Sequence, residues 1–175
     1  MSAPEWTIRQ ATVDEIERLV DLRMAMFDAM DLLDEENRER IRSDCHAYFQ
    51  ATLPIEVFRV WVACVSGVDA GDVTSSDEAG TCEGGLIGSI GLVIHSVPPS
   101  PSNSIGKVGY IMNLVTLPDW RRRGIARALL AHVLDVLRAE GVPIASLHAS
   151  RDGRNLYEGL GFEPKEDVPE MRLSL

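Results

Sequence analysis

The sequence contains no apolar run of about 18 residues, the length that a membrane-spanning helix needs, so we expect no membrane-embedded segment. Its first residues, Met1–Trp6, lack the basic start and the apolar stretch of a secretory signal peptide. Cysteine is scarce: Cys45, Cys64 and Cys82 are an odd number at wide spacings, and they fit neither a disulfide framework nor a metal-ligand pattern. We therefore expect free thiols in a reducing cytoplasm.

Basic residues are also few, at 17 Lys and Arg against 27 Asp and Glu, which gives a net charge of −10. This balance argues against nucleic-acid partners and against binding to anionic membranes, and it mildly favours cationic substrates such as amines. The length of 175 residues and the hydrophobic content of 45% are sufficient for a substantial core. We predict a single domain that spans residues 1–175.

Alternation and helical spacing of apolar residues predict the elements of the first half of the chain. These are a strand at Trp6–Gln10, helices at Ile16–Met30 and Asp34–Gln50, and strands at Phe58–Val65 and Leu86–His95. Thr12–Glu15 has the pattern of a capping box and starts the first helix. Gly67–Gly85 is polar and rich in glycine, which predicts a long flexible loop. Gly88 and Gly91 indicate a bulge or a close backbone approach.

In the second half, an apolar strand leads through a turn into a helix that starts with glycine. The predicted elements are strands at Tyr110–Thr116, Ile144–Ala149 and Met171–Leu175, and helices at Gly124–Glu140 and Gly153–Leu160. Between the first strand and the first helix lie Pro118, the arginines Arg121–Arg123 and Gly124. The first turn of a helix has unpaired N–H groups and a partial positive charge, which favour a phosphate. Gly124 has no Cβ, so a ligand can approach it closely.

Two motifs in this half resemble those of the GCN5-related N-acetyltransferases (GNAT). Arg121-x-x-Gly124-x-Ala126 resembles the signature that wraps the diphosphate of acetyl-coenzyme A, and Asn155-Leu-Tyr157-Glu-Gly-Leu-Gly161-Phe162 resembles the later motif of the family. The resemblance covers roughly Phe58 to the C-terminus, and the N-terminal third fits only in its order of elements. It implies an α/β (α+β) fold with a mixed, mostly antiparallel sheet that splays after the central strand and is flanked by helices.

The resemblance also assigns roles to residues. It implies that the diphosphate of acetyl-coenzyme A is wrapped by Arg121, Arg122, Arg123, Gly124, Ile125 and Ala126. The backbone of Leu114, Val115 and Thr116 is expected to pair with the pantetheine arm, and one of these amides is expected to hold the thioester oxygen. Asn155 is expected to bind the coenzyme arm, and Tyr157 to protonate the leaving thiolate as general acid.

Other roles for these residues stay open. The arginine run also fits a solvated turn or a basic nucleic-acid patch, Asn155 a helix cap, and Tyr157 a packed core residue. No general base is assigned: His148 has suitable chemistry, but we expect a satisfied core histidine there. Tyr110 and Asn113 on the central strand are expected to face the acceptor, although neither is a good base at neutral pH. A water relay is the remaining route for the proton.

Taken together with the composition, the resemblance implies an enzyme that we expect to be cytoplasmic and to move the acetyl group of acetyl-coenzyme A to a primary amine by direct attack in a ternary complex. The acceptor is a small-molecule or peptide amine whose identity the sequence does not show, and no metal is expected. A homodimer is common in the family, although nothing in the sequence proves one. The alternatives are a catalytically degenerate sensor that only binds an acyl-coenzyme A, and a transferase for a longer acyl chain.

Overall fold

The structure is a computed structural model, and it describes residues 6–65, 85–165 and 173. Its strands are β1 (Trp6–Gln10), β2 (Arg59–Val65), β3 (Leu86–Ser96), β4 (Lys107–Thr116) and β5 (Ile144–Leu147). Its helices are α1 (Ile16–Asp28), α2 (Arg38–Thr52), α3 (Ile125–Ala139) and α4 (Arg154–Glu158), with short 3-10 turns η1 (Val13–Glu15) and η2 (Pro118–Trp120). The chain combines one sheet with flanking helices: α1 and α2 follow β1, and α3 and α4 follow β4 and β5, which agrees with the predicted α/β (α+β) class.

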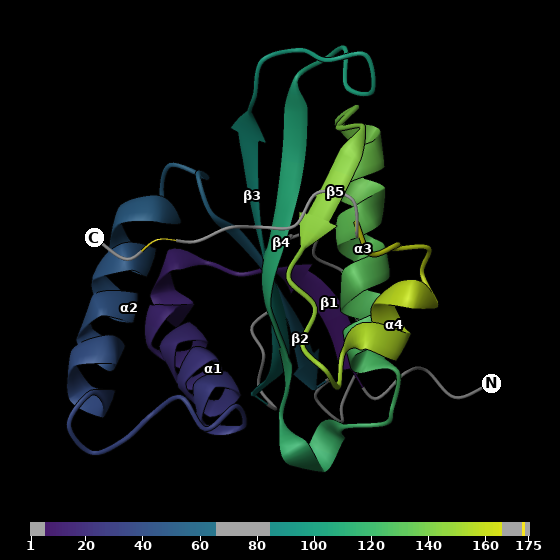
Figure 1. Ribbon diagram of the computed structural model, residues 1–175. Coiled ribbons are helices and arrows are strands. Elements are labelled where there is room, and N and C mark those ends of the chain that lie inside the picture. Colours follow the sequence, from purple (N-terminus) through teal and green to yellow (C-terminus); the bar gives the residue numbers. More distant parts are fainter. Residues whose placement is uncertain (1–5, 66–84, 166–172, 174–175) are drawn as a thin grey trace, which may run out of the picture.

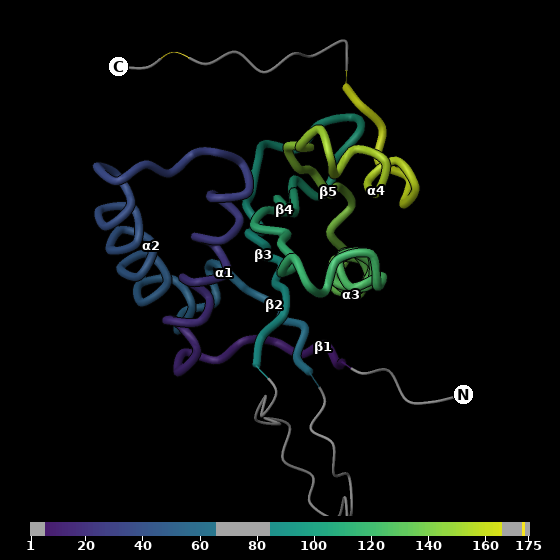
Figure 2. The backbone as a smooth tube through the Cα atoms, turned by 90° about the horizontal axis from the view of Figure 1, so that it is seen from below, coloured from purple at the N-terminus to yellow at the C-terminus, as the bar shows by residue number. Residues whose placement is uncertain are grey.

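The five strands form one sheet in the order β1-β2-β3-β4-β5. All neighbours are antiparallel except β4 and β5, which run parallel. Figures 1 and 2 show α1 and α2 on one face of the sheet and α3 on the other. The predicted mixed, mostly antiparallel sheet flanked by helices is therefore confirmed.

Each face of the sheet carries its own apolar core, and strand alternation explains the division. On β2, Val60 and Val62 pack with the residues of α1 and α2, whereas Trp61 and Ala63 pack with those of α3. Helix α3 turns one apolar stripe to the sheet, and its buried residues are Ile125, Leu129, Leu130, Val133 and Leu137. Helical spacing in the sequence predicts most of this stripe.

The glycines of β3 are sites of close approach, as the sequence predicts. A Cβ on Gly91 would lie 2.4 Å from the ring of Phe58, and one on Gly88 would lie 2.7 Å from the backbone oxygen of Val115. The pairing of β3 with β4 also shifts between Ser89 and Gly91. Only glycine leaves enough room at these two positions.

The predicted splay of the sheet lies between β4 and β5. Their pairing covers only Val108–Ile111 with Ile144–Leu147, although β4 continues to Thr116. Within the described residues, no strand pairs with this last part of β4 on the β5 side. On its other edge, β4 pairs with β3 and contains a bulge. Ser89 pairs with Val115 and Gly91 pairs with Met112, so β4 has one residue more than β3 between these two pairs. Such a bulge bends a strand and often lies beside an active site.

Several predicted boundaries need correction. Helix α2 begins at Arg38 and not at Asp34, because Asp34 and Asn37 bind each other's backbone N–H and form a turn before the helix. Helix α1 ends at Asp28, two residues before the predicted end at Met30. Strand β4 starts at Lys107, three residues earlier than predicted, and β5 ends at Leu147 instead of Ala149.

Some predictions concern residues that the structure does not describe. They are the loop Gly67–Gly85 apart from Gly85, Cys82, and the strand Met171–Leu175 apart from the exposed Leu173. Cys45 is a buried free thiol as expected, but Cys64 takes part in a disulfide bond, so the expectation of free thiols is wrong for it. None of the described helices has the length and apolar character that a membrane crossing would need.

Candidate functional site

A cleft of about 580 Å³ opens at the N-terminus of α3. It is lined by residues of η2, the turn after it, the first turn of α3, and α4, including Trp120, Ile125, Ala126, Asp152 and Leu156. Gly124 caps the helix in the left-handed conformation with φ of 82°, and a Cβ there would meet nothing within 4 Å. The free N–H groups of the first helical turn therefore have open space in front of them.

Arginines dominate the charge of this cleft. Arg121, Arg122 and Arg127 line it, against the single carboxylate of Asp152. Arg127 also donates a hydrogen bond of 3.2 Å to the backbone oxygen of Gly159, which joins α3 to the end of α4. Because the arginines and the helix dipole add to each other, the cleft favours an anion such as a diphosphate.

The C-terminal end of β4 lies between this cleft and a second hollow. The second hollow has about 350 Å³, lies between the end of α1 and the chain after β4, and shares Thr116 and Arg121 with the cleft. The hydroxyl oxygen of Thr116 is buried and has no hydrogen-bond partner within the described residues. A buried hydroxyl without a partner is costly, so it marks a place where a polar ligand atom fits.

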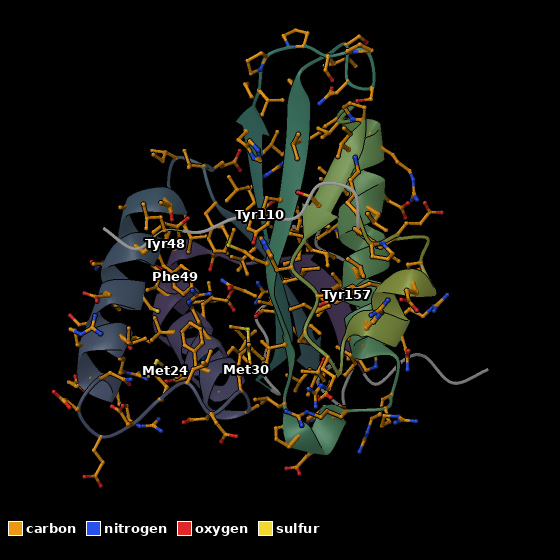
Figure 3. All side chains as sticks on the ribbon, in the orientation of Figure 1. Met24, Met30, Tyr48, Phe49, Tyr110 and Tyr157 are labelled. Carbon is orange, nitrogen blue, oxygen red and sulfur yellow. The ribbon has the colours of Figure 1, made fainter. Side chains whose placement is uncertain are left out.

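Tyr157 lies on α4 and is half-buried (Figure 3). Its ring packs edge-on against Phe162 with 6.1 Å between centroids, and a Cβ on Gly153 would lie 2.7 Å from it. Burial raises the pKa of the Tyr157 phenol above its ordinary value. A phenol with a raised pKa stays protonated at neutral pH and can serve as a proton donor.

Comparison with known protein families shows which family this chain belongs to. Residues 31–162 match the sequence profile of the acetyltransferase (GNAT) family. The chain belongs to this family. The match covers both the arginine and glycine motif and the tyrosine motif of the GNAT chain.

Individual relatives agree with this assignment. The chain is 32% identical over 92 residues to the curated glucosamine 6-phosphate N-acetyltransferase of Trypanosoma brucei brucei, which covers 53% of this chain and 59% of that protein. Among solved structures it resembles the GCN5-related N-acetyltransferase of Ralstonia eutropha JMP134, with a TM-score of 0.75, 25% identity, and coverage of 95% and 98% of the two chains. The "predicted acetyltransferase with acetyl-CoA" of Clostridium acetobutylicum shares the fold, with a TM-score of 0.76, 22% identity, and coverage of 95% and 96%.

Not all of the residues that the GNAT resemblance assigns to the site line the cleft. The cleft brings together Thr116, Arg121, Arg122, Gly124, Ile125, Ala126 and Asn155. Arg123 lies instead with its guanidinium 4.6 Å above the ring of Trp120. Leu114 packs in the core under α3, the buried Val115 lines the second hollow, and Tyr157 lines neither space.

Sequence reasoning missed two contacts of this region. Arg23 of α1 donates a hydrogen bond to the side-chain oxygen of Asn113, and its guanidinium lies 4.6 Å above the ring of Phe27. Asn113 has φ of 56°, a left-handed conformation that asparagine tolerates better than most residues. No spacing signal connects Arg23 with Asn113, because they are far apart in the sequence. The position of Arg127 near the cleft, by contrast, can be predicted from the sequence, because Arg127 belongs to the first turn of the predicted helix.

The expectation for His148 is wrong in one respect. It is exposed rather than buried in the core, although it is hydrogen-bonded: its Nδ1 lies 2.5 Å from the hydroxyl oxygen of Tyr110. The described part of the chain contains no group of His, Cys, Asp and Glu side chains that could hold a metal ion.

Proposed function

We propose that this GNAT protein is an acetyl-coenzyme A-dependent N-acetyltransferase that acts on a primary amine. The observation that carries the proposal is the continuity between two features. The edge of β4 that no described strand pairs on the β5 side ends at Thr116, and the arginine-lined cleft at the N-terminus of α3 includes the same residue. A ligand with an extended amide-containing arm and a diphosphate would meet both features at once.

Acetyl-coenzyme A would bind along the site from its diphosphate to its pantetheine arm. Backbone N–H groups from Gly124 to Ala126 hold the diphosphate, and Arg121 and Arg122 add charge to it. The pantetheine arm pairs with the free backbone edge of Leu114–Thr116, much as an added strand does. Asn155 binds the arm from the α4 side of the cleft. Arg123, which stacks on Trp120, shapes the turn more than it touches the ligand.

Acetyl transfer then proceeds in a ternary complex without a covalent enzyme intermediate. The nitrogen lone pair of the neutral amine forms a bond to the thioester carbon, and a β4 amide near the bulge stabilises the developing oxyanion. The C–S bond breaks with its electron pair on sulfur, and Tyr157 gives its proton to the thiolate. Tyr157 recovers a proton from the former amine nitrogen, which leaves an amide and free coenzyme A.

The acceptor is a small-molecule or peptide amine. An amino sugar phosphate is a specific candidate, because the Trypanosoma brucei brucei relative at 32% identity is a glucosamine 6-phosphate N-acetyltransferase. The match leaves about two fifths of that relative uncovered, so other amines belong in any screen. We place the enzyme in the cytoplasm, without a nucleic-acid or membrane partner, and a homodimer fits the proposal as well as a monomer.

The test is a coupled assay of free thiol release from acetyl-coenzyme A with a panel of amines. The panel contains glucosamine 6-phosphate, glucosamine, spermidine, an amino acid amide and a peptide with a free N-terminus. Acetylated product with at least one amine, confirmed by mass spectrometry, is the expected result. Coenzyme binding without transfer to any amine would favour the sensor alternative. Faster transfer from a longer acyl-coenzyme A than from acetyl-coenzyme A would favour a different acyl donor.

A further inference from the structure

Tyr110 and His148 form a side-chain pair that the mechanism above does not use. The hydroxyl oxygen of Tyr110 lies 2.5 Å from Nδ1 of His148, and the two rings meet edge to face with centroids 5.7 Å apart. Tyr110 is on β4, and His148 is the residue that directly follows β5. The pair therefore joins the two strands that separate at the candidate site.

The position of the pair relates it to the proposed reaction centre. Backbone pairing of β4 with β5 stops at Ile111 and Leu147, so Tyr110 and His148 lie at the closed end of the gap. The bulge at Asn113 is three residues further along β4, roughly 10 Å at the usual rise of a strand. A phenol side chain and a substrate amine together can bridge this distance. Tyr110 comes from β4, which borders the gap, and Tyr157 comes from α4 (Figure 3).

Several other groups that could accept a proton have partners among the described residues. The side chain of Asn113 accepts the hydrogen bond from Arg23. Among the other described histidines, His46 pairs with Glu17 at 2.9 Å, and His132 lies against Trp61 with ring centroids 5.9 Å apart. Asp28, at the end of α1, forms an ion pair with Arg38. Of the two described histidines that are exposed, His95 and His148, it is His148 that is hydrogen-bonded to a tyrosine at the gap.

We propose that Tyr110 and His148 form the relay that removes a proton from the acceptor amine, an inference that rests on the proposed N-acetyltransferase function. The ammonium N–H gives its proton to the hydroxyl oxygen of Tyr110, while the hydroxyl proton of Tyr110 passes to Nδ1 of His148. In the tautomer that accepts at Nδ1, His148 carries its proton on Nε2, so it becomes an imidazolium and then loses one proton to water. The neutral amine attacks, and one proton per turnover leaves through the relay.

Removal of the imidazole tests the relay directly. In His148→Ala, we expect kcat for the fastest amine of the panel to fall by about 10²-fold, the scale of general base catalysis. Free imidazole added to the assay is expected to restore at least about tenfold of this loss, because it can occupy the position of the missing ring. The matched control is His95→Ala, which removes another exposed histidine, from β3, and is expected to keep the wild-type rate with or without imidazole.

The variant Tyr110→Phe distinguishes a proton-transfer role of the Tyr110 hydroxyl from a purely structural role. We expect a similar loss of kcat, no rescue by imidazole, and unchanged calorimetric affinity for acetyl-coenzyme A, while Tyr48→Phe on α2 serves as the matched control. Full activity of folded His148→Ala or Tyr110→Phe, or a loss in His148→Ala that imidazole does not restore, would overturn the relay and leave the proposed function in place. No acetyl transfer by the wild-type protein to any amine of the panel would overturn the proposed function, and the relay with it.

Discussion

Nε of Arg121 donates a hydrogen bond of 3.2 Å to the backbone oxygen of Thr116. This bond ties the first arginine of the turn before α3 to the last residue of β4. The two parts of the proposed donor site, the free strand edge and the arginine-lined cleft, are therefore held together by one side chain. A bound coenzyme that touches both parts would find them already in position, which reduces the entropic cost of binding.

Gly124→Glu is expected to abolish measurable binding of acetyl-coenzyme A. The new carboxylate would stand at the mouth of the cleft, where it repels a diphosphate and fills the open space. Calorimetric titration measures the effect. The control is Gly141→Glu at the other end of α3, because Gly141 also has a left-handed φ, of 66°, and open space around it. Both variants carry the same backbone strain, so equal coenzyme affinity in the two would contradict the assignment of the cleft.

Tyr157→Phe is expected to lower kcat by about 10²-fold and to leave the affinity for acetyl-coenzyme A unchanged. The phenol donates its proton only as the thiolate leaves, so its loss acts on the chemical step. Because burial raises the pKa of Tyr157, a loss of rate through its ionisation is expected at a higher pH than for an ordinary tyrosine. Steady-state kinetics from pH 6 to about pH 10 tests both statements. An unchanged kcat in Tyr157→Phe would leave Tyr157 as a packing residue.

The Arg9–Glu15 ion pair is expected to make stability depend on pH on the acid side. Two hydrogen bonds of 2.8 Å and 2.6 Å join the side chains. Burial alone raises the pKa of Glu15, but the bonds from Arg9 and from the N–H of Thr12 outweigh it, so this pKa lies below its ordinary value. The stabilisation is therefore complete above the ordinary carboxyl pKa and is lost as the pH falls toward the lowered value.

Glu15→Gln is accordingly expected to reduce the free energy of unfolding at pH 7 by about 1 to 3 kcal/mol. The difference from the wild-type protein should shrink as the pH falls below the ordinary carboxyl pKa toward the lowered pKa of Glu15, because the wild-type carboxylate then loses its charge. Urea unfolding at several pH values measures this. Asp135→Asn, which breaks an exposed pair with Arg138, is the control with an expected effect below about 1 kcal/mol. A constant difference at all pH values would contradict the assignment.

Gly91→Ala is expected to destabilise the fold by about 1 to 3 kcal/mol, because its Cβ would lie 2.4 Å from the ring of Phe58. Phe58 is fully buried and stacks on Phe49, so the ring has little room to move. The double variant Gly91→Ala, Phe58→Leu should show a smaller total loss than the sum of the single variants. Additive losses in thermal or urea unfolding would show that the contact is not the cause.

Local patterns predict much of this fold because they report local physics. β1 has the predicted bounds, and β2, β3 and α3 agree with the prediction to within one residue at each end. The errors fall where side chains override the pattern, as at Asp34 and Asn37 before α2. The splay between β4 and β5 was available only from the family resemblance, since apolar runs do not show where pairing stops.

In the candidate site, too, features that are local in the sequence could be predicted, and contacts between distant segments could not. The helix start at Gly124 and the arginines before it are contiguous in sequence, so their motif predicts the cleft. The contacts of Arg23 with Asn113 and of Tyr110 with His148 join distant segments, and no periodicity reveals them. His148 was expected in the core as part of the predicted strand Ile144–Ala149, but β5 ends at Leu147 and leaves His148 exposed.

The most direct test of the account is calorimetric titration of the wild-type protein with acetyl-coenzyme A and with S-acetylpantetheine, which lacks the diphosphate. The account predicts a Kd in the micromolar range for acetyl-coenzyme A, about −8 kcal/mol, and binding at least about 100-fold weaker for S-acetylpantetheine. Equal affinity for the two compounds would contradict diphosphate binding at the N-terminus of α3. No binding of acetyl-coenzyme A at millimolar concentration would contradict the donor site as a whole.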